Sequence, residues 1–442
     1  MPHAFAAFSD LAAHLDNLGM FRMRPELGRL QSVLAALGIL PAGSPRPKAV
    51  IQVAGTNGKG STSTFLAALA ESHGLRTGLF TSPHFVSFRE RIRLDGKLLP
   101  EEDLLAPANA IMAAGGESLT YFELVTALAA LVYAGRFGSG NTLPVDLAVM
   151  ETGLGGTWDA VTALPADMVA FTPIGLDHCR ILGDTIPVIA ADKAGAMRPG
   201  KPVFSALQPE DAADSLIRAA KERGCPLTFT GGRSTLPEPA RDGSIPLGLA
   251  GGHQFVNAGL ALAAWRALAE ANNWKTDPEK EVLGLSRAFI PGRLQYVPPC
   301  PEKGHPALLL DGAHNAHGMA ALGRALAENG SAPAAVIFSC LEDKVPADMA
   351  AHLRVLSTGP VFIPPIPGNP RAMPPEDMAR AVGLAATPVA CMAEALEMAA
   401  RHVADYMPDE AAAHPERHPV LICGSLYMLG DFFALRPDCL ER

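Results

Sequence analysis

The sequence predicts a mixed α/β protein with a P-loop-containing N-terminal domain and a smaller, Rossmann-like C-terminal α/β domain. Three observations lead to this fold class. The chain has 442 residues, which is too long for one typical hydrophobic core. Short, almost wholly apolar runs alternate with segments of helical periodicity from about residue 50 onward. A Gly-rich loop with one lysine, at residues 55–61, follows the first of these runs.

The elements of the N-terminal part are expected in a fixed order. Two amphipathic helices come first, and one of them carries Leu27, Leu30 and Leu34 on a single face. A strand, the Gly-rich loop and a helix that stops at Gly74 follow. The expected helices are 8–18, 27–37, 121–134 and 253–270, and the expected strands are Val50–Val53, Thr77–Thr81, Val145–Met150 and Met168–Phe171.

A proline-rich stretch at residues 291–306 predicts a linker between the two domains. Beyond it the α/β alternation resumes, which predicts a second, smaller domain. The expected domains are therefore residues 1–290 and 307–442. The strands expected in the second domain are Ala307–Leu310, Ala335–Phe338, Val361–Ile363 and Val420–Cys423, and its expected helices include 317–328 and 391–404.

Composition excludes several classes of protein. Hydrophobic residues make up 48% and charged residues 18%, which is typical of a folded chain and not of a disordered one. The net charge of −9 gives no basic field for nucleic acid, so a nucleic-acid partner is not expected. The seven cysteines are scattered and form no Cys-x-x-Cys motif, which favours reduced thiols and argues against zinc or a disulfide framework.

Cellular location is expected to be cytoplasmic. Asp10, His14 and Asp16 interrupt the N-terminal segment where a signal peptide needs an apolar stretch. No window approaches about 18 uncharged apolar residues, so no membrane partner or span is expected.

The Gly-rich loop predicts a site for a nucleoside triphosphate. Gly55, Gly58 and Gly60 allow backbone N–H groups to turn inward, and the helix that follows adds a partial positive charge. Lys59 supplies a full charge, and Ser61 supplies a hydroxyl suited to Mg²⁺. The strict P-loop pattern needs a glycine at Val53 and Ser or Thr directly after the lysine, so this loop is a variant.

Polar groups follow the ends of four predicted strands. Lys59, Ser82, Glu151 and His178 each lie just past such an end, where ligands of open α/β sheets gather. The oxygen donors of Ser61, Ser82 and Glu151 suit Mg²⁺, and one imidazole from His178 suits a second metal position.

Two further segments leave two interpretations open. Arg89, Arg91 and Arg93 alternate with other residues, so in an extended segment they form either a basic stripe or a solvated edge strand. Asp311 to Asn315 follows the first strand of the second domain and is either a nucleotide contact or an Asp/Asn-rich turn.

Taken together, these segments resemble the Mur ligase superfamily and, within it, the folylpolyglutamate synthase/dihydrofolate synthase family. The resemblance extends from the N-terminal helices to the end of the chain and makes the N-terminal domain a Mur-ligase-like ATPase domain. The segments that carry it, in the order of the family, are 54–62, 81–92, 121–123, 151–156, 175–178, 181–185, 192–195, 291–294, 311–315 and 423–427.

The resemblance implies an ATP-dependent amide ligase that adds L-glutamate to dihydropteroate, to tetrahydrofolate, or to both. In the family, ATP phosphorylates a carboxylate of the substrate, and the amine of glutamate then displaces phosphate from the acyl phosphate. ATP and Mg²⁺, the latter at two sites, are the implied cofactors, and a monomer is the expected state.

The resemblance also assigns residues to roles. The implied ATP contacts are Asn57, Gly58, Lys59, Gly60, Ser61, Asn257, Arg293, Asp311 and His314. The implied metal ligands are Ser61, Ser82, Glu151, His178 and Lys193, of which Lys193 matches a lysine that is carbamylated in the family. The catalytic residues are expected to be Lys59, His178 and Lys193, and the implied contacts to the pterin substrate are Phe122, Glu123, Asp159 and Ala160.

Carbamylation requires a neutral amine, so the site is expected to lower the pKa of Lys193. The sequence departs from the family at Thr157, Val161 and Thr162, and at the pair Cys179-Arg180, all on the substrate side.

Two other functions fit the sequence less well. A cell-wall Mur ligase generally has a nucleotide-sugar-binding domain before the phosphate loop, and the 54 residues before Gly55 are too few for one. A P-loop regulatory NTPase would not need Lys193, Arg293 and the Asp311 segment in this order.

Overall fold

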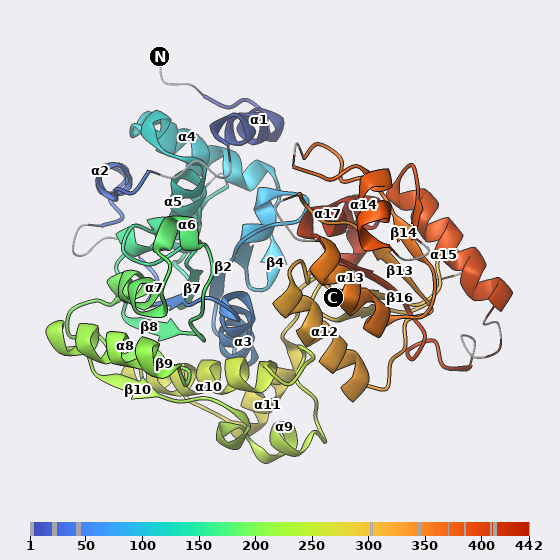
Figure 1. Ribbon diagram of the computed structural model, residues 1–442. Coiled ribbons are helices and arrows are strands. Elements are labelled where there is room, and N and C mark those ends of the chain that lie inside the picture. The colour runs from blue at the N-terminus through green and yellow to red at the C-terminus, as the bar shows by residue number, and fades with distance from the viewer. Residues whose placement is uncertain are drawn as a thin grey trace. The chain divides into compact units, whose positions relative to one another are not determined.

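The computed structural model describes residues 4–19, 24–40, 46–138, 140–300, 302, 304–342, 346–369, 371–383, 386–406, 409 and 413–441. The chain forms two compact units, and Figure 1 colours the chain from blue at the N-terminus to red at the C-terminus. Unit 1 comprises Met1–Gly248 and His253–Ala288, and unit 2 comprises Leu249–Gly252 and Phe289–Arg442. Among the described residues, no helix combines the length and the apolar character needed to cross a membrane.

Unit 1 is built on an eight-stranded sheet with the strand order β10-β9-β8-β1-β7-β2-β3-β4. Its strands are β1 Ala49–Ala54, β2 Thr77–Phe80, β3 Ile92–Leu94, β4 Lys97–Leu98, β7 Leu147–Glu151, β8 Met168–Phe171, β9 Val203–Ser205 and β10 Leu227–Phe229. The central strands β8, β1, β7 and β2 are parallel to one another. All six residues of β1 are buried, as expected for a parallel strand covered on both faces.

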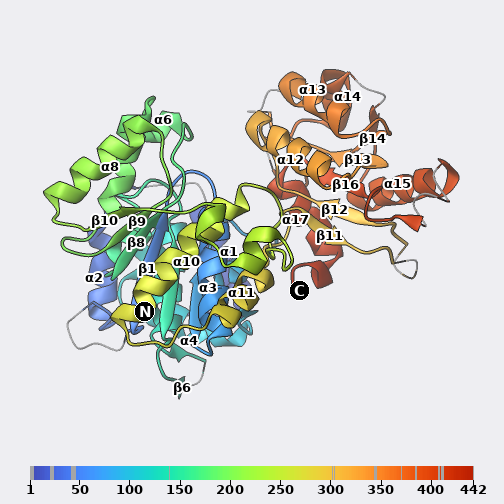
Figure 2. The ribbon, with the colours of Figure 1, turned by 90° about the horizontal axis from the view of Figure 1, so that it is seen from below.

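Helices cover the two faces of this sheet (Figures 1 and 2). The helices α3, α10 and α11 pack together, and α3 and α10 also contact the sheet. The other face carries α5 and α7, because the cores they form include Val50 and Ala54, which alternate onto the same side of β1. The helices of unit 1 are α1 Phe8–Leu18, α2 Gly28–Ala36, α3 Lys59–Ser72, α4 Leu105–Ala113, α5 Tyr121–Tyr133, α6 Cys179–Leu182, α7 Ile186–Lys193, α8 Glu210–Glu222, α9 Glu238–Asp242, α10 Gln254–Ala271 and α11 Pro278–Arg287.

Most of the predicted elements of unit 1 are confirmed within one or two residues, because their apolar periodicity is strong. Neither of the two interpretations left open for the arginine segment, a basic stripe or a solvated edge strand, holds for Arg89 and Arg91, and only Arg93 lies in a strand, β3. Residues Phe88–Arg91 form a 3-10 helix, since the Glu90 carboxylate accepts hydrogen bonds from the N–H groups of Phe85, Val86 and Ser87 at 2.7–2.8 Å. The side chain of Arg91 is consequently buried and does not line a strand.

Unit 2 contains a six-stranded sheet with the order β11-β12-β16-β13-β14-β15. Its strands are β11 Gln295–Val297, β12 Leu308–Leu310, β13 Ala335–Phe338, β14 Val361–Ile363, β15 Ala386–Pro388 and β16 Val420–Cys423. Its helices are α12 Ala316–Glu328, α13 Pro346–Leu356, α14 Pro375–Val382, α15 Met392–Tyr406 and α17 Leu426–Leu435. One buried core joins the sheet to α12, α13 and α14, while α15 and α17 contact the sheet on its other side (Figure 2).

The proline-rich stretch at 291–306 differs from a plain connection. Its residues Gln295–Val297 form β11, which pairs antiparallel with β12 at the edge of the second sheet. Two residues of this stretch, Pro301 and Lys303, lie outside the described residues. All seven cysteines are free thiols, as their scattered positions suggested.

Candidate active site

The Gly-rich loop connects the carboxyl end of β1 to the first residue of α3, as predicted. Gly58 caps the helix with φ of 89°, a left-handed conformation that favours glycine. A Cβ on Gly58 would lie 2.2 Å from Oδ1 of Asn257, so this side chain from α10 packs directly on the loop. Because the N–H groups of the first helical turn lack intrahelical partners and the helix dipole is positive here, the loop suits a phosphate.

The loop is held in place by the segment that follows β8. The N–H groups of Thr56 and Asn57 both donate to the carbonyl oxygen of Pro173, at 3.1 and 3.2 Å. The ammonium of Lys59 folds back over the loop and donates to the carbonyl oxygens of Gly55 and Thr56 at 3.3 and 3.2 Å. The charge of Lys59 therefore lies over the loop itself.

The Glu151 carboxylate lies beside the first turn of α3. It ends β7, is buried, and accepts a hydrogen bond from the backbone N–H of Ser82 at 3.0 Å. A Cβ on Gly60 would lie 3.6 Å from Oε2 of Glu151. The parallel register of β1, β7 and β2 creates this proximity, as the strand-end rule predicted.

The donor set at this edge fits Mg²⁺. A buried carboxylate next to a phosphate loop, with the hydroxyl group of Ser61 on the first turn of α3, supplies the oxygen ligands that this ion prefers. Within the described ranges, no group of three or more His, Cys, Asp and Glu side chains is arranged to hold a metal. A site with a single buried carboxylate is compatible with Mg²⁺, because this ion keeps several waters and is bound through one or two carboxylates plus phosphates.

His178 is exposed to solvent, whereas Lys59 and Ser82 are partly buried and Glu151 is buried. Its side chain is 57% exposed and lies 3.7 Å from the Asp177 carboxylate, and its backbone has φ of 50°. The structure therefore brings Lys59, Ser82 and Glu151 together, whereas His178 lies on an exposed turn before α6.

Lys193 is the last residue of α7 and is buried, with 4% exposure. Burial, and next the repulsion from the charge of Lys59, lower the pKa of the Lys193 ammonium to about 8. Carboxylates at Asp192, Asp177 and Asp159 oppose this shift. The expected depression of this pKa is confirmed, and its cause places Lys193 within the field of the phosphate-loop lysine.

Asp159 lies in the loop that follows β7, and backbone N–H groups donate hydrogen bonds to both oxygens of its carboxylate. Its carboxylate accepts N–H groups from Leu154 at 2.9 Å and from Val161 at 3.0 Å. Burial raises its pKa to about 6, although these hydrogen bonds and the charge of Lys59 act in the opposite direction. Ala160 follows directly and is buried at the start of a short 3-10 helix.

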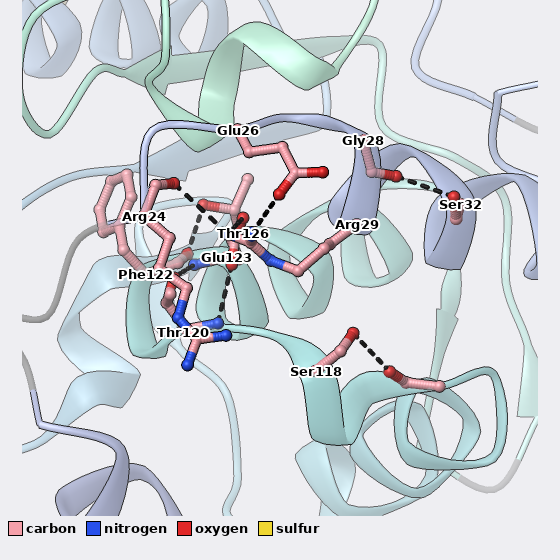
Figure 3. A network of polar contacts seen from close by, with 11 residues as sticks. Arg24, Glu26, Gly28, Arg29, Ser32, Ser118, Thr120, Phe122, Glu123 and Thr126 are labelled. Carbon is pink, nitrogen blue, oxygen red and sulfur yellow. Dashed lines mark hydrogen bonds and ion pairs between the residues drawn. The ribbon is translucent and has the colours of Figure 1, made fainter.

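Phe122 and Glu123 lie in the first turn of α5 and have different surroundings (Figure 3). The ring of Phe122 packs on the backbone of Gly153, where a Cβ would lie 2.7 Å from the ring. The Glu123 carboxylate caps α5 by accepting the N–H of Thr120 at 2.8 Å, and it pairs with Arg29 of α2 at 3.0 Å. Arg29 also contacts Glu26 and the carbonyl oxygen of Arg24.

A partly buried cluster next to Ser82 is absent from the residues predicted from the sequence. Arg91 donates from Nε to Nδ1 of His84 at 2.7 Å and lies over the ring of Tyr121, 5.4 Å from its centroid. Burial and then the Arg91 charge lower the pKa of His84 to about 3, so this imidazole is neutral. The alternation of arginines is the available signal in the sequence, but its spacing is that of a strand and does not indicate a buried cluster.

Unit 2 brings its own predicted residues together. The Asp311 carboxylate accepts N–H groups from Leu294 and Ala313, both at 2.9 Å. A Cβ on Gly312 would lie 2.9 Å from Nη1 of Arg293, and Nδ1 of His314 lies 2.7 Å from the carbonyl oxygen of Gly312. The Asp311 segment is thus a turn, and the side chains of Arg293 and His314 both lie close to Gly312 within it.

A family model, curated relatives and solved structures all show similarity to this chain. Residues 292–426 match the family described as Mur ligase, glutamate ligase domain. A dihydrofolate synthase/folylpolyglutamate synthase of Bacillus subtilis (strain 168) is 32% identical over 378 residues, which are 80% of this chain and 84% of the relative.

Two solved structures are similar over nearly the whole chain. E. coli FolC in complex with DHPP and ADP has a TM-score of 0.78 and 28% identity, and 99% of each chain is covered. The bifunctional folylpolyglutamate synthase/dihydrofolate synthase of Yersinia pestis, complexed with AMPPNP and Mn ion, has a TM-score of 0.77 and 28% identity. That alignment covers 99% of this chain and the whole of the other.

Proposed function

We propose that this chain, which belongs to the dihydrofolate synthase/folylpolyglutamate synthase family, is an ATP-dependent ligase that adds L-glutamate to dihydropteroate, to tetrahydrofolate, or to both. The relationship to the Bacillus subtilis enzyme carries this assignment. The buried Glu151 carboxylate beside the phosphate loop supports it, because it places a metal-binding oxygen where a triphosphate would be held.

The reaction needs an activated acid. ATP phosphorylates a carboxylate of the folate-class substrate, and the amino group of glutamate attacks the acyl phosphate through a tetrahedral intermediate that releases phosphate. Phosphoryl transfer depends mainly on positioning and charge neutralisation. We assign both tasks to the first turn of α3 and its loop, through Asn57, Gly58, Lys59, Gly60 and Ser61.

The metal positions are assigned to the same edge of the sheet. Ser61, Ser82 and Glu151 are proposed to hold one Mg²⁺, and His178 and Lys193 are proposed to hold a second. When bound, Mg²⁺ neutralises the charge that develops on the transferred phosphoryl group. The neutral form of Lys193 can react with carbon dioxide to give a carbamate and a proton, which replaces an ammonium by an oxygen ligand.

The remaining substrate contacts stay proposals as well. Phe122, Glu123, Asp159 and Ala160 are proposed to contact the pterin substrate, and the position of Phe122 against the loop after β7 supports this. The proposed nucleotide contacts outside the phosphate loop are Asn257 in unit 1 and Arg293, Asp311 and His314 in unit 2.

We propose further that the protein acts as a cytoplasmic monomer on small molecules, without nucleic-acid or membrane partners. The proposed functional domains are residues 1–290, with the N-terminal helices and the ATPase core, and 307–442, the glutamate-ligase domain. Residues 291–306 are proposed to connect them, and β11 within this stretch is part of the sheet of unit 2.

The test is direct glutamylation. Purified protein is supplied with ATP, Mg²⁺ and L-glutamate, together with dihydropteroate or tetrahydrofolate, and product mass is read for each. One added glutamate on at least one acceptor is expected, and Glu151→Gln should lower the rate at least about a hundredfold and raise the Mg²⁺ requirement. Addition to neither acceptor would overturn the proposal, and phosphate release that ignores both acceptors would point to a regulatory NTPase.

A further inference from the structure

Trp158 stands out among the three tryptophans because it is exposed. Its exposure is 52%, whereas Trp265 is fully buried and stacks with Trp274 at 6.0 Å between ring centroids. Tryptophan carries a large apolar surface, and leaving half of it in water loses the stabilisation that burial would give. The exposed part of the indole ring is therefore available for contact with a ligand.

The backbone on both sides of Trp158 is fixed. The N–H and the hydroxyl group of Thr157 both donate to the carbonyl oxygen of Asp192, at 3.0 and 2.9 Å. On the other side, the Asp159 carboxylate is held by two backbone N–H groups, one of them from Leu154 at the start of the same loop. The indole ring is thus presented from a rigid segment, which lowers the entropy cost of a contact with a ligand.

The same loop touches predicted site residues at two points. Gly153, which begins it, packs under the ring of Phe122. Gly156 packs on the backbone of Lys193, where a Cβ would lie 2.3 Å from the carbonyl oxygen. Trp158 follows these two contact points, so it is an exposed ring on a rigid loop at the carboxyl end of β7, close in sequence to the positions where that loop contacts Phe122 and Lys193.

We propose that Trp158 is a specificity-determining residue that stacks on a planar ring of the folate-class substrate. This inference rests on the proposed function, whose acceptor substrates contain two planar rings, the pyrimidine ring of the pterin and the p-aminobenzoyl ring. Aromatic rings prefer offset-stacked or edge-to-face contact, and an indole with a fixed backbone offers a large surface for it. The contact forms with the acceptor alone, so it acts on acceptor affinity and leaves the nucleotide unaffected.

The test compares Trp158→Ala, Trp158→Phe and the control Trp274→Phe. Trp158→Ala should raise KM for the acceptor about tenfold, with kcat and the KM for ATP changed less than about twofold, since a stacking contact contributes to ground-state binding. Trp158→Phe keeps a ring and should stay within about threefold of the wild-type acceptor KM. An unchanged acceptor KM in Trp158→Ala, or an equal rise in the KM for ATP, would overturn the inference.

Tryptophan emission provides a second readout that needs no turnover. Adding dihydropteroate or tetrahydrofolate in the presence of ADP should change the emission of the wild type and of Trp274→Phe, but not that of Trp158→Phe. An emission change of wild-type size in Trp158→Phe would count against stacking. The product mass of the wild type is measured in the same series. If the wild type makes no glutamylated product, the proposed function has failed. If the wild type is active and Trp158→Ala has an unchanged acceptor KM, this inference alone has failed.

Discussion

Replacing Lys193 by methionine is expected to abolish turnover and, in the absence of metal and carbon dioxide, to stabilise the fold. The amine is buried with 4% exposure, and its pKa falls from 10.5 to about 8. At pH 7.5 roughly a quarter of such an amine is neutral, compared with about one in a thousand for an ordinary lysine. The site thus favours the neutral amine that can form a carbamate, and the charged form of this lysine lowers the stability of the fold.

The magnitude follows from the same pKa values. The unfolded chain binds the extra proton between about pH 8 and pH 10.5, so stability rises with pH across this window and the full cost is present below it. Converted to free energy, the difference corresponds to about 3 kcal/mol below pH 8. Lys193→Met removes this cost and fills similar volume with an apolar chain, so its melting temperature should rise by several degrees at pH 7.

The assay is thermal unfolding of both proteins in EDTA and carbon-dioxide-free buffer at pH 7 and pH 10, beside glutamylation rates. Lys221→Met, on an exposed lysine of α8, is the control and should shift the melting temperature little. The advantage of Lys193→Met should shrink at pH 10. A melting temperature below that of the wild type at pH 7 would refute the burial cost, and wild-type turnover would refute the role in the reaction. Partial rescue of Lys193→Ala by short carboxylic acids would support the carbamate.

Two further predictions concern the phosphate loop and the α2–α5 contact. Gly58→Ala would bring a Cβ to 2.2 Å from Asn257 at φ of 89°, so the KM for ATP should rise about tenfold or more. Gly74→Ala has φ of 81° and open space, and it should leave that KM unchanged in the same assay. Arg29→Met should lower the free energy of unfolding in urea by about 1–3 kcal/mol, because it leaves the nearly buried Glu123 carboxylate without its partner. A double-mutant cycle with Glu123→Gln that showed no coupling would contradict the ion pair.

The sequence predicted the sheet edge well because its signals are local. The apolar run Met168–Phe171 is β8 itself, and Val50–Val53 lies within β1. Once these strands are taken as parallel, their carboxyl ends must meet at one edge, and this rule brings Glu151 next to the phosphate loop without further information. The three-residue strand β9 was not predicted because it has only two apolar residues before a serine, whereas β14, also of three residues, is wholly apolar and was predicted.

Features that depend on distant residues could not be predicted. Arg91 has the spacing of a strand residue, yet the capping of its segment by Glu90 turns the backbone into a 3-10 helix and buries the guanidinium against His84. The lowered pKa of Lys193 was expected from the family resemblance alone, because its causes are burial and the charge of Lys59, which lies in another helix. Neither effect leaves a trace in the spacing of residues along the chain.

Glu123 shows how structure changes the interpretation of a residue that the sequence had already selected. The resemblance assigned it to the substrate, but one carboxylate oxygen caps α5 and the other pairs with Arg29, 94 residues away in sequence (Figure 3). Because the adjacent Phe122 lies in the same helical turn and packs on the loop after β7, the ion pair fixes the segment that presents this ring. Substitutions at Glu123 therefore act on stability as well as on substrate affinity, and only the coupling with Arg29 separates the two effects.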